Sequence, residues 1–455
     1  MFWKWAKESR SKDPRRVFVL GLDGTPHSFV QELTAQGELP HLAKLVAGGS
    51  IRRMRSVLPT VSSVAWASYM TGVNPGKHNL FGFVDRNPDP FDLFIPTAAH
   101  LRRETLWEIL SRAGKRVVVI NVPPSYPPRP VNGVLVGCFL TPNLEKGVHP
   151  ASLVPVLQRM GYRIDVDAWK ARQDREGFLA DLHEALDRRF QVAFHLMEEE
   201  PWDFFQLHVM ETDRINHFLW PAWEDDDPDW APRFLSYYRK IDGYIGELVG
   251  RLGRGLEDGE VSLLILSDHG FCKVRGELYV NHWLEREGYL RLPEGEARKL
   301  PEYLPETRAY SLIPGRIFVN LRGREQKGSV APAKAYKDLR DRLIEGLSGL
   351  RDPETGSAMV RKVHRREEIY AGPFLERAAD LVIEPEEGFD PKGNLDRSVL
   401  VATGEIGGMH TLDDAFLLMY PGDLPDRDWE IVDVMPGILR IMGVEAPPGL
   451  DGRTW

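Results

Sequence analysis

The sequence has few cysteines, no long apolar run and no excess of basic residues. Only two cysteines, Cys138 and Cys272, occur in 455 residues, so neither a disulfide framework nor a four-cysteine zinc site can form. A single bridge between them stays open, but a reduced, cytoplasmic setting is the simpler interpretation. The longest apolar runs, "RVVVINV" and "VSLLIL", are too short to cross a bilayer, so we expect no transmembrane segment.

The net charge of the chain also limits the ligands that we expect it to bind. The formal net charge is -9 and the sequence pI is about 5.9, which argues against a broad nucleic-acid-binding face. A small phosphate-bearing substrate remains compatible with this acidity, because a local metal charge can outweigh the global field. Nothing in the pattern indicates an oligomeric state.

The first 15 residues form a basic, aromatic segment that differs from the rest of the chain. It lacks the apolar stretch and cleavage site of a signal peptide. We expect a mobile tail or a short helix on the body. Contact with a membrane surface or a partner is the alternative, because Phe2, Trp3 and Trp5 lie among Lys and Arg.

The remaining residues, 16–455, predict one α/β catalytic domain. Apolar, β-branched runs at 16–24, 116–124, 203–211 and 261–270 alternate with amphipathic helical segments. This alternation is typical of a mainly parallel central sheet with helices on both faces. Residues 271–400 do not continue this alternation, and polar residues that suit a reactive site lie on both sides of them in the sequence. We therefore expect an inserted cap or subdomain within about 271–400.

Three of the predicted strands end in polar clusters. Asp23 follows the first, Glu211-Thr212-Asp213 the third, and Ser267-Asp268-His269 the fourth. Ligands of open α/β sheets bind beyond the carboxyl ends of the strands. We therefore expect these side chains to gather at one edge of the sheet.

The residue types in these clusters suit metal ions. Asp213 and His217 are four apart on a predicted helix and project from one face. His410 lies in the glycine-rich stretch "GEIGGMHT", which predicts a flexible loop. Mixed carboxylate and imidazole ligands favour zinc, with manganese or iron as alternatives. The set can hold two divalent ions, and its members are Asp23, Asp213, His217, Asp268, His269 and His410.

Each candidate also has an ordinary interpretation. Alone, Asp23 could cap a helix, and Asp213 with His217 could be an exposed helical pair. Their joint occurrence at strand ends favours a site. We interpret the other histidines as structural, including His78, His208 and His282, and we expect Trp66 to be a core residue.

The stretch "PTVSSVAWASYMTG" contains two adjacent serines, Ser62 and Ser63, before a helical pattern. By itself it fits an ordinary helix N-cap, because a serine oxygen accepts a free amide of the first turn. It also fits a nucleophile, and the local pattern does not decide between the two.

The motifs together resemble a known family. "GLDG", "PTVSSVAWASYMTGVNPGKHNLFGF", "DRINH", "SDHGF" and "GMHT" are similar, in this order, to those of the alkaline phosphatase superfamily. The similarity is closer to the prokaryotic branch of its type I phosphodiesterase/nucleotide pyrophosphatase family, from about residue 16 to the end. The resemblance implies an alkaline-phosphatase-like fold and a small phosphoester substrate.

The resemblance also implies a role for each site residue. One ion would be held by Asp213, His217 and His410. The second would be held by Asp23, Asp268 and His269, with Ser62 as an additional ligand. Ser62 would be the nucleophile and would form a phosphoseryl intermediate, and the Ser63 amide would bind non-bridging oxygens.

Departures from the family pattern concern the substrate. Ser62-Ser63-Val64-Ala65 stands where nucleotide pyrophosphatases commonly have Thr-Phe-Pro-Asn, so a base-holding aromatic and a phosphate-binding asparagine are missing. Asn79 stands where a glycine is usual. The resemblance therefore implies a metal-dependent hydrolase of phosphodiester or pyrophosphate bonds more firmly than it implies specificity for nucleotides.

Other functions remain as alternatives. The same scaffold could act as a phosphomonoesterase or a phosphomutase. A sulfatase is disfavoured, because its nucleophile motif requires proline where this chain has Val64. A catalytically silent binding protein is a remote alternative, since every expected ligand and the hydroxyl are present.

Overall fold

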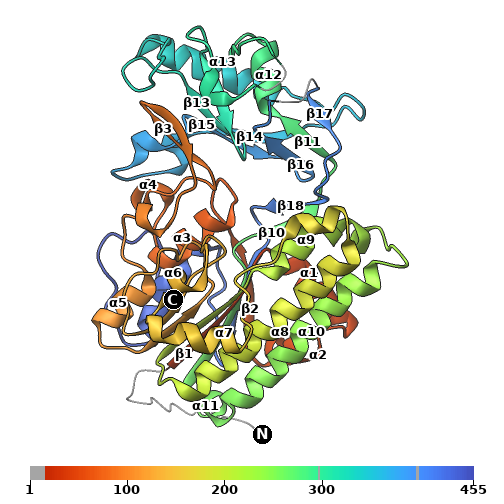
Figure 1. Ribbon diagram of the computed structural model, residues 1–455, viewed down its shortest axis with the longest axis vertical. Coiled ribbons are helices and arrows are strands. Elements are labelled where there is room, and N and C mark those ends of the chain that lie inside the picture. Colours follow the sequence, from red (N-terminus) through yellow and green to blue (C-terminus); the bar gives the residue numbers. More distant parts are fainter. Residues whose placement is uncertain (1–15, 296–297, 396–398) are drawn as a thin grey trace, which may run out of the picture.

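A nine-stranded sheet forms the centre of the larger lobe (Figure 1). The computed structural model describes residues 16–295, 298–395 and 399–455. Neighbouring strands β9, β1, β8, β5 and β6 run parallel, whereas β19 and β7 are antiparallel to their neighbours in this run. The order across the sheet is β20 (Trp429–Glu430), β2 (Ser50–Arg55), β19 (Ala415–Tyr420), β9 (Val261–Leu266), β1 (Arg16–Leu22), β8 (Phe204–Val209), β5 (Val117–Ile120), β6 (Gly133–Val136) and β7 (Val148–His149).

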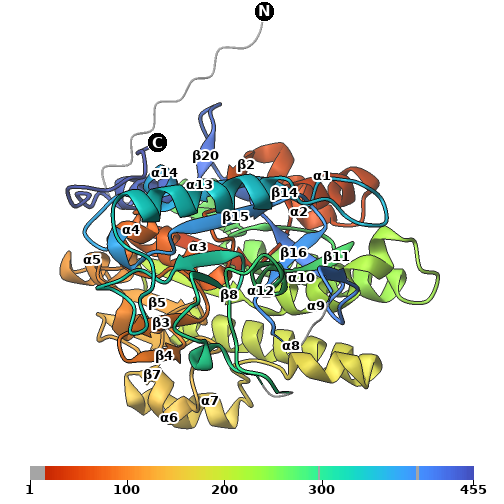
Figure 2. The ribbon, with the colours of Figure 1, turned by 90° about the horizontal axis from the view of Figure 1, so that it is seen from above.

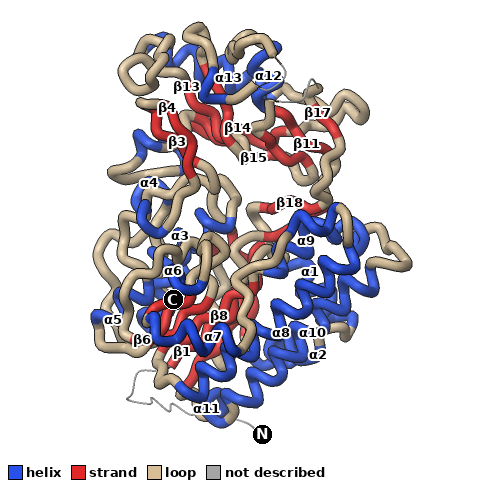
Figure 3. The backbone as a smooth tube through the Cα atoms, in the orientation of Figure 1, coloured by secondary structure: helices blue, strands red, loops and turns tan. Residues whose placement is uncertain are grey.

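Both faces of this sheet are buried under helices (Figure 3). Along β1, Phe18 and Leu20 pack into one core, while Val17 and Val19 pack into the other, because successive side chains of a strand alternate. The first core is closed by α1 (His27–Gln36), α2 (Pro40–Gly48), α8 (Arg175–Glu199), α9 (Glu211–Glu224) and α10 (Ala231–Leu252). The second is closed by α3 (Ser62–Thr71), α5 (Leu106–Arg112) and α15 (Val434–Ile441). The predicted mainly parallel α/β architecture is confirmed.

A smaller lobe lies over the larger one when the molecule is seen from above (Figure 2). It has its own hydrophobic core, and α12 (Val280–Arg286) and α13 (Lys334–Ser348) pack on it. An antiparallel sheet comprises β12 (Ala309–Leu312), β13 (Arg316–Val319), β15 (Leu381–Pro385) and β14 (Val360–Arg365). A second sheet comprises β16 (Phe389–Lys392), β11 (Gly276–Tyr279) and β17 (Val401–Ala402).

An early hairpin joins this smaller lobe. It consists of β3 (Asp85–Pro88) and β4 (Phe91–Phe94), far from the other strands of the lobe in sequence. The Phe91 ring packs edge-on against Tyr303 and Tyr310, with centroids 5.3 and 5.4 Å away. The smaller lobe therefore contains chain from outside the expected interval of 271–400.

Two strands connect the lobes. β10 (Gly270–Lys273) pairs with β18 (Gly408–Thr411) in an antiparallel ladder, which lies between the two lobes in Figure 1. The shorter helices of the connections are α4 (Pro75–His78), α6 (Leu144–Gly147), α7 (Val154–Arg159), α11 (Arg254–Glu257) and α14 (Arg366–Ile369).

The structure also bears on the expectations about the two cysteines and about transmembrane segments. Cys138 and Cys272 are both free, so the bridge that the sequence left open does not form. Within the described ranges, no helix has the length and apolarity needed to cross a membrane. The basic, aromatic segment of residues 1–15 lies outside the described residues.

Candidate active site

The carboxyl ends of three neighbouring strands bring the predicted site residues together. β9, β1 and β8 are adjacent and parallel, so the segments that follow them emerge at one edge of the sheet. Asp23 follows β1, Asp213 lies in the first turn of α9 after β8, and Asp268 follows β9. All three carboxylates are buried at this edge.

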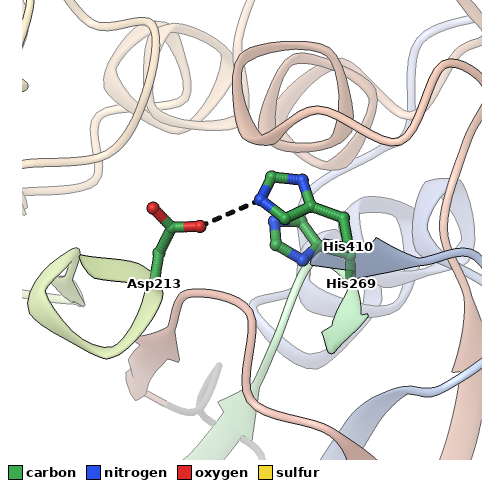
Figure 4. A group of neighbouring side chains, drawn as sticks. All are labelled: Asp213, His269 and His410. Carbon is green, nitrogen blue, oxygen red and sulfur yellow. Dashed lines mark hydrogen bonds and ion pairs between the residues drawn. The ribbon is translucent and has the colours of Figure 1, made fainter. Parts of the chain in front are cut away.

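The first cluster consists of Asp213, His217 and His410. His217 follows Asp213 by one turn of α9, and its Nε2 lies 3.4 Å from Asp213 Oδ1. His410 Nε2 lies 3.1 Å from Asp213 Oδ1 and 3.1 Å from His217 Nε2. Figure 4 shows the contact between Asp213 and His410, with the ring of His269 next to His410. Three ligand-type atoms thus converge on one point.

The second cluster consists of Ser62, Asp23, Asp268 and His269. Ser62 Oγ lies 3.1 Å from Asp23 Oδ1 and 3.2 Å from His269 Nε2. His269 Nε2 lies 3.4 Å from Asp23 Oδ1 and 3.4 Å from Asp268 Oδ2. The rings of His269 and His410 stack with centroids 3.7 Å apart, so the two clusters are neighbours.

These spacings fit metal coordination. Ligands at about 2.0–2.1 Å from a tetrahedral ion lie about 3.3 Å from one another. The distances within the two clusters fall between 3.1 and 3.4 Å. Asp23, Asp268 and His269 of the second cluster have ligand atoms close enough to share an ion. Asp213, His269 and His410, which combine residues of both clusters, also meet this condition. The seven predicted side chains therefore lie where they could hold two ions.

The hydrogen bonds of the histidines leave one nitrogen of each ring free for an ion. Nδ1 of each ring lies 2.9 to 3.0 Å from a backbone carbonyl, which can only accept, so Nδ1 carries the proton. The Nε2 atoms of His217 and His410 then face each other at 3.1 Å, an arrangement that a cation between them, either a proton or a metal ion, stabilises. The donor–acceptor pairs are His217–Gly408, His269–Gly270 and His410–Thr60.

The aspartates are arranged in the same way, with one oxygen held and the other free. Asp213 Oδ2 accepts from Arg214 Nη1 at 3.3 Å. Asp268 Oδ1 accepts from the Gly24 amide at 3.1 Å, while its buried Oδ2 has no hydrogen-bond partner within the described chain. Asp23 Oδ2 accepts from Trp66 Nε1 at 3.0 Å. The other oxygens, Asp213 Oδ1, Asp268 Oδ2 and Asp23 Oδ1, face the histidines of the two clusters.

The electrostatics of the clusters also favour a bound cation. Burial and the charges of Asp23 and Asp213 raise the pKa of Asp268 well above its ordinary value. Burial alone would raise the pKa of Asp213, but His217 and His410 lower it. Three buried carboxylates cannot all ionise cheaply without added positive charge.

Ser62 is the first residue of α3 and does not cap it. The N-cap position is Val61, and no side-chain cap bond is present at this helix end. The Ser62 hydroxyl contacts Asp23 and His269 instead. The N-terminus of α3, with its free amides and positive dipole end, therefore points into the second cluster.

A cavity of about 790 Å³ opens over the clusters, between the two lobes. Ser62, Asp213, His217 and His410 form part of its lining. Its walls include five aromatic side chains, and Trp169 among them is 53% exposed. These aromatic residues are Phe83, Phe139, Trp169, Phe218 and Tyr279.

Comparison with known protein families shows to which family the chain belongs. Residues 17–413 match the family described as type I phosphodiesterase / nucleotide pyrophosphatase. The chain belongs to this family. The resemblance inferred from the motifs is thereby confirmed, and membership in the type I phosphodiesterase/nucleotide pyrophosphatase family indicates a phosphoester hydrolase.

Solved structures of similar fold agree with this assignment. Phosphonoacetate hydrolase from Sinorhizobium meliloti 1021 is 18% identical, with a TM-score of 0.63, over 94% of this chain and 96% of that chain. Murine ectonucleotide pyrophosphatase / phosphodiesterase 5 is 14% identical, with a TM-score of 0.60, over 96% of this chain and 97% of that chain. At these identities, the likeness shows a shared fold.

In this member of the type I phosphodiesterase/nucleotide pyrophosphatase family, the setting of His410 differs from expectation. The glycine-rich stretch predicted a flexible loop, but His410 lies on β18, opposite Phe271 of β10. The prediction was wrong because glycines do not prevent a ladder when a partner strand is near. The Phe271 ring packs 4.9 to 5.8 Å from the rings of His217, His269 and His410 and helps to orient them.

Other polar residues of the strand ends and loops have structural surroundings. Glu211 forms a fully buried ion pair with Arg189, away from the clusters. His78 is buried, lies 2.9 Å from Ser68 Oγ and accepts from the Leu80 amide, as expected for a structural histidine.

Sequence reasoning missed two residues that contact Asp23. Trp66 and His208 are buried, as expected, but both lie against its outer oxygen. Trp66 could have been found from the sequence, because it lies one helical turn after Ser62. His208 could also have been noticed, because it is a histidine next to the carboxyl end of an apolar strand.

Proposed function

We propose that this protein hydrolyses phosphodiester bonds, with Ser62 as the nucleophile and two divalent ions in the clusters. Asp213, His217 and His410 would hold one ion, and Asp23, Asp268, His269 and Ser62 would hold the other. The observation that carries this proposal is the set of inward-facing, bare ligand atoms 3.1 to 3.4 Å apart. Three histidines and three carboxylates favour zinc, with manganese or iron as alternatives.

The residues of the chain would divide the reaction between them. When bound, the ions supply positive charge that lowers the pKa of the Ser62 hydroxyl and stabilises the phosphoryl oxygens. Ser62 Oγ attacks phosphorus, so that an Oγ–P bond forms and the bond to the leaving alcohol breaks. The Ser63 amide at the start of α3 donates to a non-bridging oxygen. Water then releases the phosphoryl group from Ser62.

The basic residues of the cavity favour a diester over a monoester. Four basic side chains belong to its lining, and each has an acidic partner. Arg172 pairs with Glu405, and Arg214 pairs with Asp165, at 2.6 and 2.7 Å. Arg361 and Lys392 are paired with Asp413 and Asp390. A monoester dianion or a second phosphate, as a mutase requires, would therefore find little uncommitted positive charge.

The cavity walls favour an apolar or aromatic leaving group. Phe83 and Phe139 stack with centroids 6.1 Å apart, and Trp169 stands exposed at the cavity lining. A volume of about 790 Å³ is typical of a site for a drug-sized ligand rather than for phosphate alone. A relative of similar fold was solved with phosphonoformate and another with AMP, so the fold accommodates phosphorus-centred anions of different size.

Hydrolysis of two nitrophenyl esters would test the proposal. Metal-stripped protein reloaded with zinc or manganese should cleave bis-p-nitrophenyl phosphate faster than p-nitrophenyl phosphate. Ser62→Ala should lower this rate on the order of 10³-fold or more while keeping two bound ions. Ser63→Ala is the matched control, because the buried Ser63 Oγ has no hydrogen-bond partner in the part of the chain that the structure describes, and the amide of residue 63 remains.

Each outcome has a distinct meaning. Preference for the monoester would favour the phosphatase or mutase alternative with the same site residues. A normal rate in Ser62→Ala would refute the nucleophile assignment. A protein without bound metal and without turnover would support the silent binding protein.

A further inference from the structure

Two buried side chains meet at the outer oxygen of Asp23. Trp66 Nε1 donates to Asp23 Oδ2 at 3.0 Å, and His208 Nε2 lies 3.1 Å from the same oxygen. The other oxygen, Oδ1, faces Ser62 Oγ at 3.1 Å. The carboxylate is therefore contacted on both sides, and only Oδ1 is presented to the second cluster.

The contact depends on how α3 and β8 approach β1. Trp66 follows Ser62 by one turn of α3, so one helix face reaches both oxygens of Asp23. His208, on β8, is the register partner of Gly21 on β1. A Cβ atom at Gly21 would lie 2.8 Å from the Trp66 ring and 3.0 Å from His208 Nδ1. Glycine thus leaves the space in which the two rings converge.

Burial of the polar ring nitrogens of Trp66 and His208 costs free energy unless they interact with Asp23. Trp66 and His208 are both 0% exposed. Neither ring nitrogen of His208 has a hydrogen-bond partner of good geometry among the described residues, and the ion-pair contact of Nε2 is with Asp23 Oδ2, at 3.1 Å. A buried polar group without a partner costs about 1–3 kcal/mol, so an apolar side chain would fill this core position more cheaply.

We propose that Trp66 and His208 are positioning residues that hold Asp23 in its ligand orientation for the ion next to Ser62. This inference rests on the proposed function, because it concerns that metal site. Partners behind a metal ligand fix its orientation, and their loss costs about 10–100-fold in metal affinity. The loss should fall on one ion alone, because the polar partner of both side chains is Asp23, a residue of the second cluster.

The experiment measures zinc binding to the full-length chain. Metal-stripped wild type, Trp66→Phe and His208→Phe are titrated with zinc in competition with a chromophoric chelator, and bound metal is counted by mass spectrometry. Trp107→Phe and His78→Phe are matched controls, because both replace a buried side chain of the same type away from the clusters. His208→Gln restores an N–H donor and serves as the rescue variant.

The expected result is site-selective. Trp66→Phe and His208→Phe should bind one ion as wild type does and the other about 10–100-fold more weakly. His208→Gln should recover part of this loss, and the two control variants should bind both ions normally. The unaffected ion also reports that the variants are folded.

Two results would overturn the inference, and they differ from failure of the proposed function. Unchanged affinity for both ions in Trp66→Phe and His208→Phe would refute the positioning role alone. Equal weakening of both ions, in these variants and in the controls, would show general structural damage and also refute it. Wild-type protein that binds no zinc, manganese or iron would refute the metal site itself and the positioning role with it.

Discussion

Replacement of Asp268 by asparagine should stabilise the metal-free protein and reduce the stabilisation that bound metal supplies. Asp268 is fully buried near Asp23 and Asp213, and its Oδ2 has no hydrogen-bond partner within the described chain. Without a cation, the carboxylate is a repelled and unsatisfied group. Asp268→Asn removes that charge and keeps the oxygen that can accept from the Gly24 amide. With an ion bound, the same change removes a ligand.

The magnitudes follow from these two roles. In the metal-free protein, relief of an unsatisfied buried group should raise the free energy of unfolding by about 1–3 kcal/mol. In the loaded protein, a 100-fold weaker site would remove up to about 2.7 kcal/mol of metal-linked stability. The substitution should therefore stabilise the stripped protein, and zinc should stabilise the variant by up to about 2.7 kcal/mol less than it stabilises wild type.

The stability difference between Asp268→Asn and wild type should also depend on pH. The pKa of Asp268 is raised from its ordinary value of 3.8, so the folded, metal-free protein holds its proton more tightly than the unfolded chain does. Stability from this group is present at low pH and is lost as pH rises from the unfolded towards the folded pKa. The advantage of Asp268→Asn over wild type should therefore grow with pH above about 4.

Urea unfolding of both proteins, stripped and zinc-loaded, at several pH values would measure these differences, and metal analysis would give the occupancy. Ser262→Ala is a useful control, because it alters a buried polar residue of β9 whose Oγ has no hydrogen-bond partner within the described chain, and it leaves the charge unchanged. Destabilisation of the stripped protein by Asp268→Asn would contradict the argument from charge repulsion. An unchanged metal stoichiometry would contradict the ligand assignment.

Two further substitutions test the surroundings of the site. Gly21→Ala should lower the free energy of unfolding by about 1–3 kcal/mol, because its Cβ would lie 2.8 Å from the Trp66 ring. Urea unfolding would measure this loss, and a stability equal to that of wild type would mean that the rings of Trp66 and His208 can shift freely. Phe139→Ala should raise KM for aryl diesters about tenfold with normal zinc content, since a lost aromatic contact is worth about 1.4 kcal/mol. An unchanged KM would place the leaving group elsewhere, and Phe91→Ala, outside the cavity lining, controls for the loss of an aromatic side chain.

Much of the fold could be predicted because its signals are local. The strands β1, β5, β8 and β9 are buried on both faces. Such strands are nearly continuous apolar runs in the sequence and can therefore be recognised there. The short strands β2 and β19 were not predicted. Their residues become strand only by pairing with each other and with β9, which is a non-local event.

The smaller lobe illustrates the same limit. Its inserted helices and strands have clear patterns, but the hairpin β3–β4 comes from the early part of the chain. It packs there because Phe91 meets Tyr303 and Tyr310 and because Arg86 forms a buried ion pair with Glu325. No sequence spacing links these partners, which are more than 200 residues apart.

The sequence by itself determined which chemical groups the site contains. Strand ends carry Asp23, Asp213 and Asp268, and parallel strands necessarily deliver such residues to one edge. Only the tertiary structure decided how each group is oriented, through carbonyls that fix the histidine tautomers and through Trp66 and His208 behind Asp23. Orientation depends on contacts between α3, β1 and β8, segments that meet only when the sheet is assembled, and a linear pattern does not encode those contacts.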